Sequence, residues 1–321
     1  MKKFILFLSL FFALALPAWS QTPVALDTIW TLKKIGFGTI QSVIFSNDGS
    51  KIYHTLGNKI QIRNTSDGSL IKTIKCSENE DEDLIQVAAT PDDRYIITSS
   101  DTGLVKLWDA QTGQMILKYP IDTTNQLIGK MSYRASNKFA ITKDSKYVIV
   151  PYLHAELENP NDPTNWHYYS SYFVYELLTS KIIQKVFHYK YPINTFVVSN
   201  STGVIAVGSN KLQFMDPYTF VISDTLIGEQ HLAGIPDMNF SPDGKLIATA
   251  GGDGYIKVWD VEKRKLITSF LQNKKLDLVQ AVKFSYNGQN LYSTGKLMIK
   301  QAPSLFLLST RILPPRFSIM R

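Results

Sequence analysis

Six segments of this chain repeat one order of short strands and tight polar turns, and this repeat constrains the fold more than any other feature. In each copy, an apolar strand leads through a polar turn into a second strand, then a third strand, and a polar link to one more strand. The clearest copies are Val43 to Ile74, Val87 to Tyr119 and Met238 to Phe270, and weaker copies begin near Phe139, Thr195 and Val282. A period of about 40–45 residues with four short strands is typical of a β-propeller blade.

The turns between the first two strands of each copy mark the period. The marker residues of these turns are Asp48, Asp92, Asp144, Thr202, Asp243 and Asn287. Consecutive markers are 44, 52, 58, 41 and 44 residues apart. Asp and Asn side chains bond to the turn backbone, and a following Gly supplies the positive φ that a hairpin needs. We therefore predict an all-β fold, a single β-propeller of four-stranded antiparallel blades. Six blades can be counted, and a seventh is possible if the chain is truncated.

Two repeats end their third strand on Trp-Asp, in Leu107-Trp108-Asp109 and Val258-Trp259-Asp260. With these dipeptides the chain resembles the WD-repeat β-propeller family, in an exported, bacterial type, over roughly residues 24 to 300. The resemblance implies a rigid platform for protein interactions. The family's hydrogen-bonded tetrad is matched in the fifth repeat by His231, Thr249, Asp253 and Trp259, as a structural element.

The other repeats depart from this tetrad. The second repeat keeps Thr98 and Trp108, while Glu80 takes the His position and Thr102 the Asp position. In the first, third and fourth repeats, the Trp position is occupied by Arg63, Tyr175 and Met215. The resemblance is therefore specific in two blades and general in the rest.

The first twenty residues are predicted to be a secretory signal peptide. Lys2 and Lys3 precede the apolar run Phe4 to Leu16, and Ala18-Trp19-Ser20 offers cleavage before Gln21. The run is short for a membrane span, and no later run is long enough to be one. We expect a periplasmic, secreted or cell-surface protein, whose formal charge falls from +7 to +5 after cleavage. Without a block of basic residues, no nucleic-acid partner is expected.

The predicted organisation follows from these features. Residues 1–20 form the signal and 21–301 the propeller, with repeats near 43–74, 87–119, 138–187, 193–226, 235–270 and 279–301. We expect residues 25–34 to close the last blade, whose third strand is placed at Leu297 to Gln301. Residues 302–321 are expected to be an irregular tail. Two alternatives stay open: Leu305 to Ile312 is the last blade's outer strand, or the tail is a truncated or frame-disrupted remnant of a longer protein.

Two segments are candidate partner-binding sites. The link Ser77 to Asp83 is acidic and contains Glu78, Glu80 and Asp81. It could bind a basic partner or a calcium ion, but it lacks the spacing of a calcium loop, so a solvated acidic loop is favoured and no metal site is predicted. Cys76 precedes this link and is the only cysteine of the chain, and we interpret it as structural.

The second candidate is an insertion, His154 to Tyr169, predicted to be a long loop. Its end carries aromatic and imidazole side chains suited to peptide or sugar contact: Trp166, His167, Tyr168 and Tyr169. The alternative is a loop whose aromatic side chains pack on the neighbouring blade. Long loops are often functional, so both interpretations stay open.

No catalytic residue and no cofactor are predicted. The remaining histidines form no HxH, HExxH or Cys/His cluster, and the chain has no GxSxG elbow and no phosphate-binding P-loop. We expect a monomeric, non-catalytic scaffold for an unknown protein partner, with a glycan or peptide as a possible ligand. The alternatives are a propeller enzyme or cofactor binder with a site in the central channel, and a carbohydrate or cell-surface ligand binder that uses residues 154–169.

Overall fold

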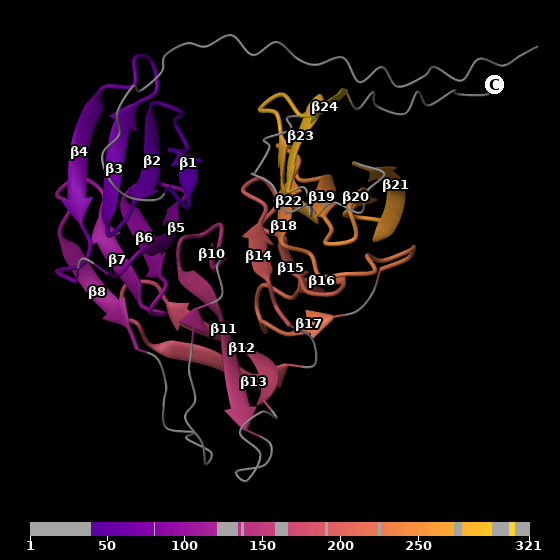
Figure 1. The fold of residues 1–321 in the computed structure, drawn as a ribbon, viewed down its shortest axis with the longest axis horizontal. Helices are drawn as coiled ribbons and strands as arrows, with labels where there is room; N and C mark the ends of the chain where they lie inside the picture. The colour runs from indigo at the N-terminus through magenta and orange to yellow at the C-terminus, as the bar shows by residue number, and fades with distance from the viewer. Residues whose placement is uncertain are drawn as a thin grey trace, which may run out of the picture.

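The computed structural model describes residues 40–79, 81–120, 134–135, 138–157, 166–189, 192–223, 226–272, 278–296 and 308–311. These residues contain strands in six antiparallel sheets and no helix. Figure 1 shows the sheets arranged around a common centre, with the first strand of each sheet innermost. The all-β propeller with six blades is therefore confirmed.

The first sheet contains β1 (Val43–Phe45), β2 (Lys51–Leu56), β3 (Lys59–Asn64) and β4 (Leu70–Lys75), and the second contains β5 (Leu84–Ala89), β6 (Tyr95–Ser100), β7 (Val105–Asp109) and β8 (Met115–Tyr119). The third contains β10 (Ala140–Ile141), β11 (Tyr147–Leu157), β12 (Trp166–Glu176) and β13 (Ile182–Tyr189), with β9 (Arg134–Ala135) paired to β11. The fourth contains β14 (Thr195–Val198), β15 (Ile205–Gly208), β16 (Leu212–Met215) and β17 (Ile222–Ser223). The fifth contains β18 (Asp237–Phe240), β19 (Leu246–Ala250), β20 (Tyr255–Asp260) and β21 (Lys265–Leu271). The sixth contains β22 (Leu278–Phe284), β23 (Asn290–Lys296) and β24 (Leu308–Arg311).

The turn after the first strand has the same hydrogen bonds in five blades. In the first blade, the Ser46 hydroxyl donates to Asp48 Oδ1 at 2.6 Å and accepts from the Lys51 N–H at 2.8 Å. Matching hydroxyl–carboxylate or hydroxyl–amide bonds of 2.6–2.7 Å join Thr90 to Asp92, Thr142 to Asp144, Ser241 to Asp243 and Ser285 to Asn287. The residue types that mark the repeat in the sequence therefore build the turn that returns each chain segment into its second strand.

Hydrophobic side chains fill the spaces between consecutive sheets. Five clusters of buried residues lie between consecutive sheets, one at each interface from the first and second sheets to the fifth and sixth. Trp259 belongs to the cluster between the fourth and fifth sheets and is fully buried. Cys76, interpreted from the sequence as structural, is buried between the first and second sheets, and burial raises the pKa of its thiol to about 12. Such burial between neighbours is the main source of stability in a repeat fold.

The first sheet differs from the others on the side that faces away from the second. Three residues before the turn hydroxyl, Val43 is 57% exposed, and one residue before it, Phe45 is 61% exposed. The residues that correspond to Val43 in the other blades are at most 3% exposed: Val87, Phe139, Phe196, Met238 and Val282. Among the described residues, no hydrophobic cluster joins the sixth sheet to the first.

The predicted loop at residues 154–169 is corrected by the structure. Strands β11 and β12 pair over their full length, from Tyr147 opposite Glu176 to Leu157 opposite Trp166. The insertion is therefore an extended β-hairpin, because its flanks are rich in the aromatic residues that favour strands. Its tip, residues 158–165, lies outside the described residues.

The end of the chain contributes a strand to the last sheet. Strand β24 pairs with β23 and lies inside Leu305 to Ile312, the segment that one of the two alternatives made an outer strand of this blade, and not in an irregular tail. An open strand edge offers unpaired N–H and C=O groups, and residues 308–311 form a ladder with them. The third strand predicted at 297–301, the signal segment 1–20 and the closing strand predicted at 25–34 lie outside the described residues.

Candidate functional site

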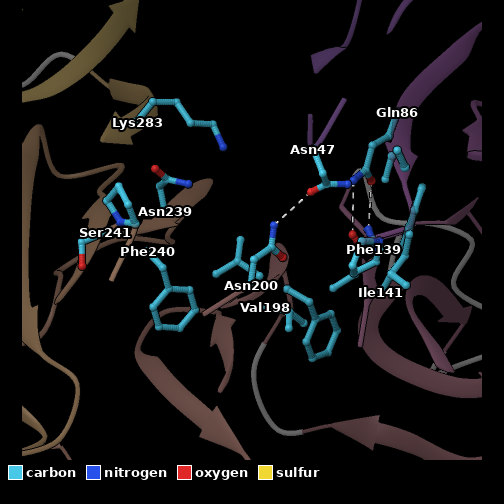
Figure 2. Close-up of a pocket in the computed structure, with 17 residues that line it drawn as sticks. Asn47, Gln86, Phe139, Ile141, Val198, Asn200, Asn239, Phe240, Ser241 and Lys283 are labelled. Carbon is cyan, nitrogen blue, oxygen red and sulfur yellow. Dashed lines mark hydrogen bonds between the residues drawn. The ribbon is translucent and has the colours of Figure 1, made fainter. Parts of the chain in front are cut away.

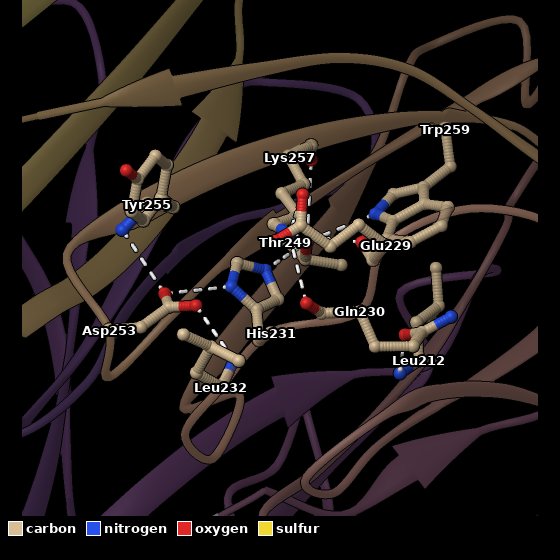
Figure 3. A network of polar contacts seen from close by, with 10 residues as sticks. All are labelled: Leu212, Glu229, Gln230, His231, Leu232, Thr249, Asp253, Tyr255, Lys257 and Trp259. Atoms are coloured by element: carbon tan, nitrogen blue, oxygen red, sulfur yellow. Dashed lines mark hydrogen bonds and ion pairs between the residues drawn. The ribbon is translucent and has the colours of Figure 1, made fainter.

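The predicted tetrad forms a continuous hydrogen-bonded chain in the fifth blade (Figure 3). His231 Nδ1 lies 2.9 Å from Asp253 Oδ1, and His231 Nε2 lies 2.7 Å from Thr249 Oγ1. The Trp259 indole N–H donates to the same Thr249 hydroxyl oxygen at 3.1 Å. The Leu232 N–H donates to the second carboxylate oxygen of Asp253 at 2.9 Å, so the network ties the link before the blade to its strands.

Burial sets the charge of the groups in this network. It lowers the pKa of His231, although Asp253 acts in the opposite direction, so the imidazole is neutral near pH 7. Burial acts to raise the pKa of Asp253, but the Leu232 N–H and His231 lower it overall. A neutral His231 then carries its proton on Nδ1 and accepts a hydrogen bond from Thr249 at Nε2. Each of these side chains is held by the others, which fits a structural rather than a catalytic role.

A buried lysine strengthens the same link. Lys257 Nζ donates to the backbone carbonyls of Glu229 and Gln230, each at 2.9 Å. The Gln230 side chain in turn accepts a hydrogen bond from the Leu212 N–H of the fourth sheet. The link from the fourth to the fifth blade is therefore fixed at both of its ends.

The second blade keeps half of this arrangement. The Trp108 indole N–H donates to Thr98 Oγ1 at 2.9 Å, and Lys106 Nζ donates to the Cys76 carbonyl at 2.7 Å. The carboxylate near Thr102 is Glu82, which is buried, at 3.5 Å. Glu80, which the sequence placed at the His position of this repeat, lies outside the described residues.

The acidic link is less charged at the surface than its sequence indicates. Glu82 is buried near Lys106, with the ammonium 3.7 Å from its carboxylate. Burial acts to raise the pKa of Glu82, but hydrogen bonds from Ser77 and Ser100 and the Lys106 ammonium lower it overall. Glu78 is exposed and pairs with Lys75 at 2.7 Å, a contact that lowers the pKa of Glu78. Asp81 is exposed.

The aromatic candidates lie on the extended hairpin. Trp166, His167, Tyr168 and Tyr169 are the first four residues of β12 and pair with β11 from Leu157 to His154. The structure thus places the four predicted residues consecutively in one paired strand.

A cavity lies where the innermost strands converge, in the central channel that the sequence left as an alternative place for a site (Figure 2). Its volume is about 340 Å³, and residues from all six blades line it. At its wall, the Asn200 side-chain N–H donates to Asn47 Oδ1 at 3.4 Å, which links the turns of the fourth and first blades. Asn239 and Lys283 extend from β18 and β22 toward the same space. An alignment of the repeats on their turn hydroxyls could have found these two residues, because each lies two positions before the hydroxyl residue of its own turn.

Catalytic and metal-binding groups are sparse in the part of the chain that the structure describes. No group of three or more His, Cys, Asp or Glu side chains there could hold a metal ion. Also within the described residues, no helix is long and apolar enough to cross a membrane.

Comparisons with known proteins agree with this architecture. Residues 68–109 and 224–260 match the family model described as "WD domain, G-beta repeat", and these two segments contain Trp108 and Trp259. The chain is 22% identical over 250 residues to "WD repeat-containing protein SL1-17" of Schistosoma mansoni, which covers 78% of the chain and 60% of that protein. It is 31% identical over 98 residues to "Periodic tryptophan protein 2" of Saccharomyces cerevisiae, which covers 30% of the chain and 11% of that protein.

A third relative is "Protein hir-1" of Neurospora crassa, 38% identical over 77 residues, or 21% of the chain and 7% of that protein. The chain thus spans about a tenth or less of two of these relatives and 60% of the third. All three are eukaryotic, so they give no support to the bacterial type that the sequence indicated.

The fold and the repeated turn define the class of this protein as a β-propeller. Two of its repeats match the model described as "WD domain, G-beta repeat", and the chain is similar to a WD repeat-containing protein. Proteins of this kind typically serve as platforms for protein interactions.

Proposed function

We propose that this protein is an exported, non-catalytic scaffold that binds a protein partner through the face that carries the β11–β12 hairpin. The observation that carries the proposal is the length of this hairpin. Its two strands have 11 residues each, whereas strands in the other five sheets have at most seven. A paired extension presents residues to a partner at low entropic cost, because its backbone is already ordered.

The base of the hairpin is braced on both sides. Strand β9 pairs with Tyr152 and Leu153 of β11, and β13 pairs with β12 from Tyr175 to Ser170. The link at residues 76–83 emerges on the same face, because links between blades and turns between second and third strands lie at the same end of the strands. Since Glu78 is paired and Glu82 is buried, we assign the link a secondary role beside the hairpin.

The carbohydrate alternative has one feature in its favour. Strand β12 begins with Trp166, His167, Tyr168 and Tyr169, and aromatic side chains of this kind can stack on a sugar or contact a peptide. Glycan binding therefore remains the second candidate function. A glycan array that shows binding lost in Trp166→Ala and retained in Tyr286→Ala would favour it over the protein scaffold.

Crosslinking tests the scaffold directly. A photo-crosslinking residue at position 168 in the mature chain, expressed in its native host, is expected to capture one dominant protein, identified by mass spectrometry. With that partner purified, calorimetry is expected to show at least a tenfold loss of affinity when the pairs Leu157–Trp166 and Glu156–His167 are deleted together with the tip between them. Tyr286→Ala, at an exposed turn on the opposite face, serves as the control. Unchanged affinity in the shortened hairpin would exclude this face as the binding site.

Export is a separate part of the proposal and rests on the N-terminal sequence alone. The mature chain isolated from its host is expected to begin at Gln21. An intact mass that retains residues 1–20 in the isolated protein would refute export, and it would leave the scaffold proposal standing.

A further inference from the structure

The central cavity has an unusual charge balance. Of the described residues that line it, Lys283 is the only one with a charged side chain, and none is a carboxylate. The carboxamides of Asn47, Gln86, Asn200 and Asn239 contribute polar atoms around it. A cavity that combines one cation with neutral polar groups attracts a ligand with a negative charge.

Other polar groups along the innermost strands are already paired. Lys138 Nζ lies 2.6 Å from Asp237 Oδ1, and the other carboxylate oxygen of Asp237 accepts from the Val282 N–H at 2.9 Å. The Gln86 amide bonds both the N–H and the C=O of Phe139, at 2.9 and 3.2 Å. These contacts join different blades and leave no free charge, so they differ in kind from Lys283.

Lys283 and Asn239 are the exceptions. Lys283 Nζ makes no hydrogen bond or ion pair with any described residue. Asn239 Oδ1 accepts from the Phe284 N–H at 2.8 Å, which fixes the amide and leaves its N–H₂ group to face the cavity. Figure 2 shows the Lys283 ammonium and the Asn239 amide nitrogen directed into the same open space.

The residues at the equivalent position in the other blades differ from Asn239 and Lys283. At the position two residues before the turn hydroxyl, the first four blades carry Ile44, Ala88, Ala140 and Val197. Only the fifth and sixth blades place hydrogen-bond donors there, and they are adjacent in the ring. A channel-facing position that is apolar in four blades therefore carries polar groups in two adjacent blades, and Lys283 is exposed and has no partner among the described residues.

We propose that this cavity is a binding site for a small hydroxylated carboxylate, such as a hydroxy acid or a sugar acid. The carboxylate accepts hydrogen bonds from Lys283 Nζ and Asn239 Nδ2, a charge-assisted arrangement that is stronger than neutral pairing. Hydroxyl groups of the ligand find an acceptor in the Asn200 carboxamide oxygen. The volume of about 340 Å³ lies at the small end of the range for ligand pockets.

This site is distinct from the proposed partner-binding face. The turns that line the cavity join the first and second strands of their blades, and they lie at the opposite end of the strands from the 76–83 link. The inference therefore goes beyond the scaffold function, and either one can fail without the other.

Two matched ligand pairs test the charge requirement on the mature chain. D-gluconate is compared with sorbitol, and D-glucuronate with D-glucose, since each pair differs chiefly by the carboxylate. Ligand-observed NMR and calorimetry are expected to show binding of at least one acid and at least tenfold weaker binding of its neutral partner. Binding of neither acid, or equal binding of acid and neutral partner, overturns the proposal.

Two substitutions place the ligand in the cavity. Lys283→Met keeps the length of the side chain and removes its charge, and Asn239→Asp keeps the acceptor for the Phe284 N–H while adding a negative charge. Each is expected to weaken binding of the acid about tenfold or more. Lys265→Met, at an exposed lysine of the outer strand β21, is the control and is expected to leave binding unchanged. Melting curves confirm folding of all three, and binding unaffected by both cavity variants would refute the site.

Discussion

The fifth and first blades place equivalent residues in different surroundings. The strand registers pair three positions of the two blades. Thr249 corresponds to His54, Lys257 to Gln61, and Trp259 to Arg63. In the fifth blade, this face is packed against the fourth sheet, and its polar groups bond to the preceding link. In the first blade, the bonds of Arg63 stay within its own sheet.

The arginine replaces the tryptophan by satisfying polar groups instead of filling space. Arg63 Nε donates to His54 Nε2 at 3.3 Å, Nη2 to Gln61 Oε1 at 2.7 Å, and Nη1 to the Gly68 carbonyl at 3.0 Å. Burial is the main cause that lowers the pKa of His54, and the Arg63 charge acts in the same direction. The difference shows that a blade can form from strand pattern and turn chemistry alone. The tetrad adds a tie between the blade and the link that precedes it.

The largest expected effect is at the tryptophan of the fifth blade. Trp259→Ala is expected to reduce the free energy of unfolding by about 3–5 kcal/mol, because it removes a fully buried side chain and leaves a cavity. Arg63→Ala is expected to cost about 1–3 kcal/mol through the unpaired Gly68 and Gln61 oxygens. Urea unfolding followed by fluorescence and by circular dichroism measures both. Equal losses would show that the two positions have the same role.

The tetrad itself gives the next effect. Asp253→Ala removes the acceptor of both His231 and the Leu232 N–H, and it is expected to reduce the free energy of unfolding by about 2 kcal/mol. Hydrogen exchange is expected to speed up at Leu232 and to stay unchanged at Val207 in the fourth sheet. A loss of protection spread over both sites would contradict a local tie between link and blade.

A matched pair of valines measures the exposed side of the first blade. Val282→Ala is expected to cost about 1.5 kcal/mol, because this residue is 1% exposed and loses two buried carbon atoms. Val43→Ala, at the same repeat position but 57% exposed, is expected to cost less than about 0.5 kcal/mol. The same urea series compares them. A cost at Val43 that equals the cost at Val282 would mean that another surface covers the first blade in solution.

The smallest effect is in the dependence of stability on pH. His231 has a folded pKa below its unfolded value of about 6.5, so the unfolded state binds the proton more readily. This contribution to stability is complete above pH 6.5 and is lost as the pH falls toward 5. His231→Gln is expected to flatten the dependence between pH 7 and 5, as measured by urea midpoints, with His54→Gln as the comparison in the first blade. An unchanged slope in His231→Gln would show that the pKa of the imidazole is the same in the folded and unfolded protein.

The repeated features of this fold are the ones that the sequence predicted well. The Ser or Thr hydroxyl and the Asp of each turn are close in sequence, so a local pattern reports their hydrogen bond, as at Ser46 and Asp48. The tetrad was found for the same reason, because spacing within one repeat places His231 near Asp253. Non-local contacts were harder. The hairpin was expected to be a loop, and the strand at β24 was only one of two alternatives for the end of the chain.

The residues that line the cavity could not be identified within any one repeat, because they come from different blades. Asn239 and Lys283 are separated by 44 residues and meet only when the ring brings β18 and β22 together. Their neighbours at the same repeat position are small or apolar, which makes the two polar residues an outlier in the alignment rather than a motif. Sequence comparison among the repeats could have raised this hypothesis, but not the shape of the site.

The solitary thiol of Cys76 provides a reporter that needs no engineering. It is the only cysteine of the chain, and it is enclosed between the first two blades with its thiolate strongly disfavoured. A maleimide at neutral pH can modify it only in molecules where those two blades have separated. The rate of labelling at increasing urea concentrations therefore measures how often the ring opens at the interface between the first and second blades. The measurement needs no substitution in the protein.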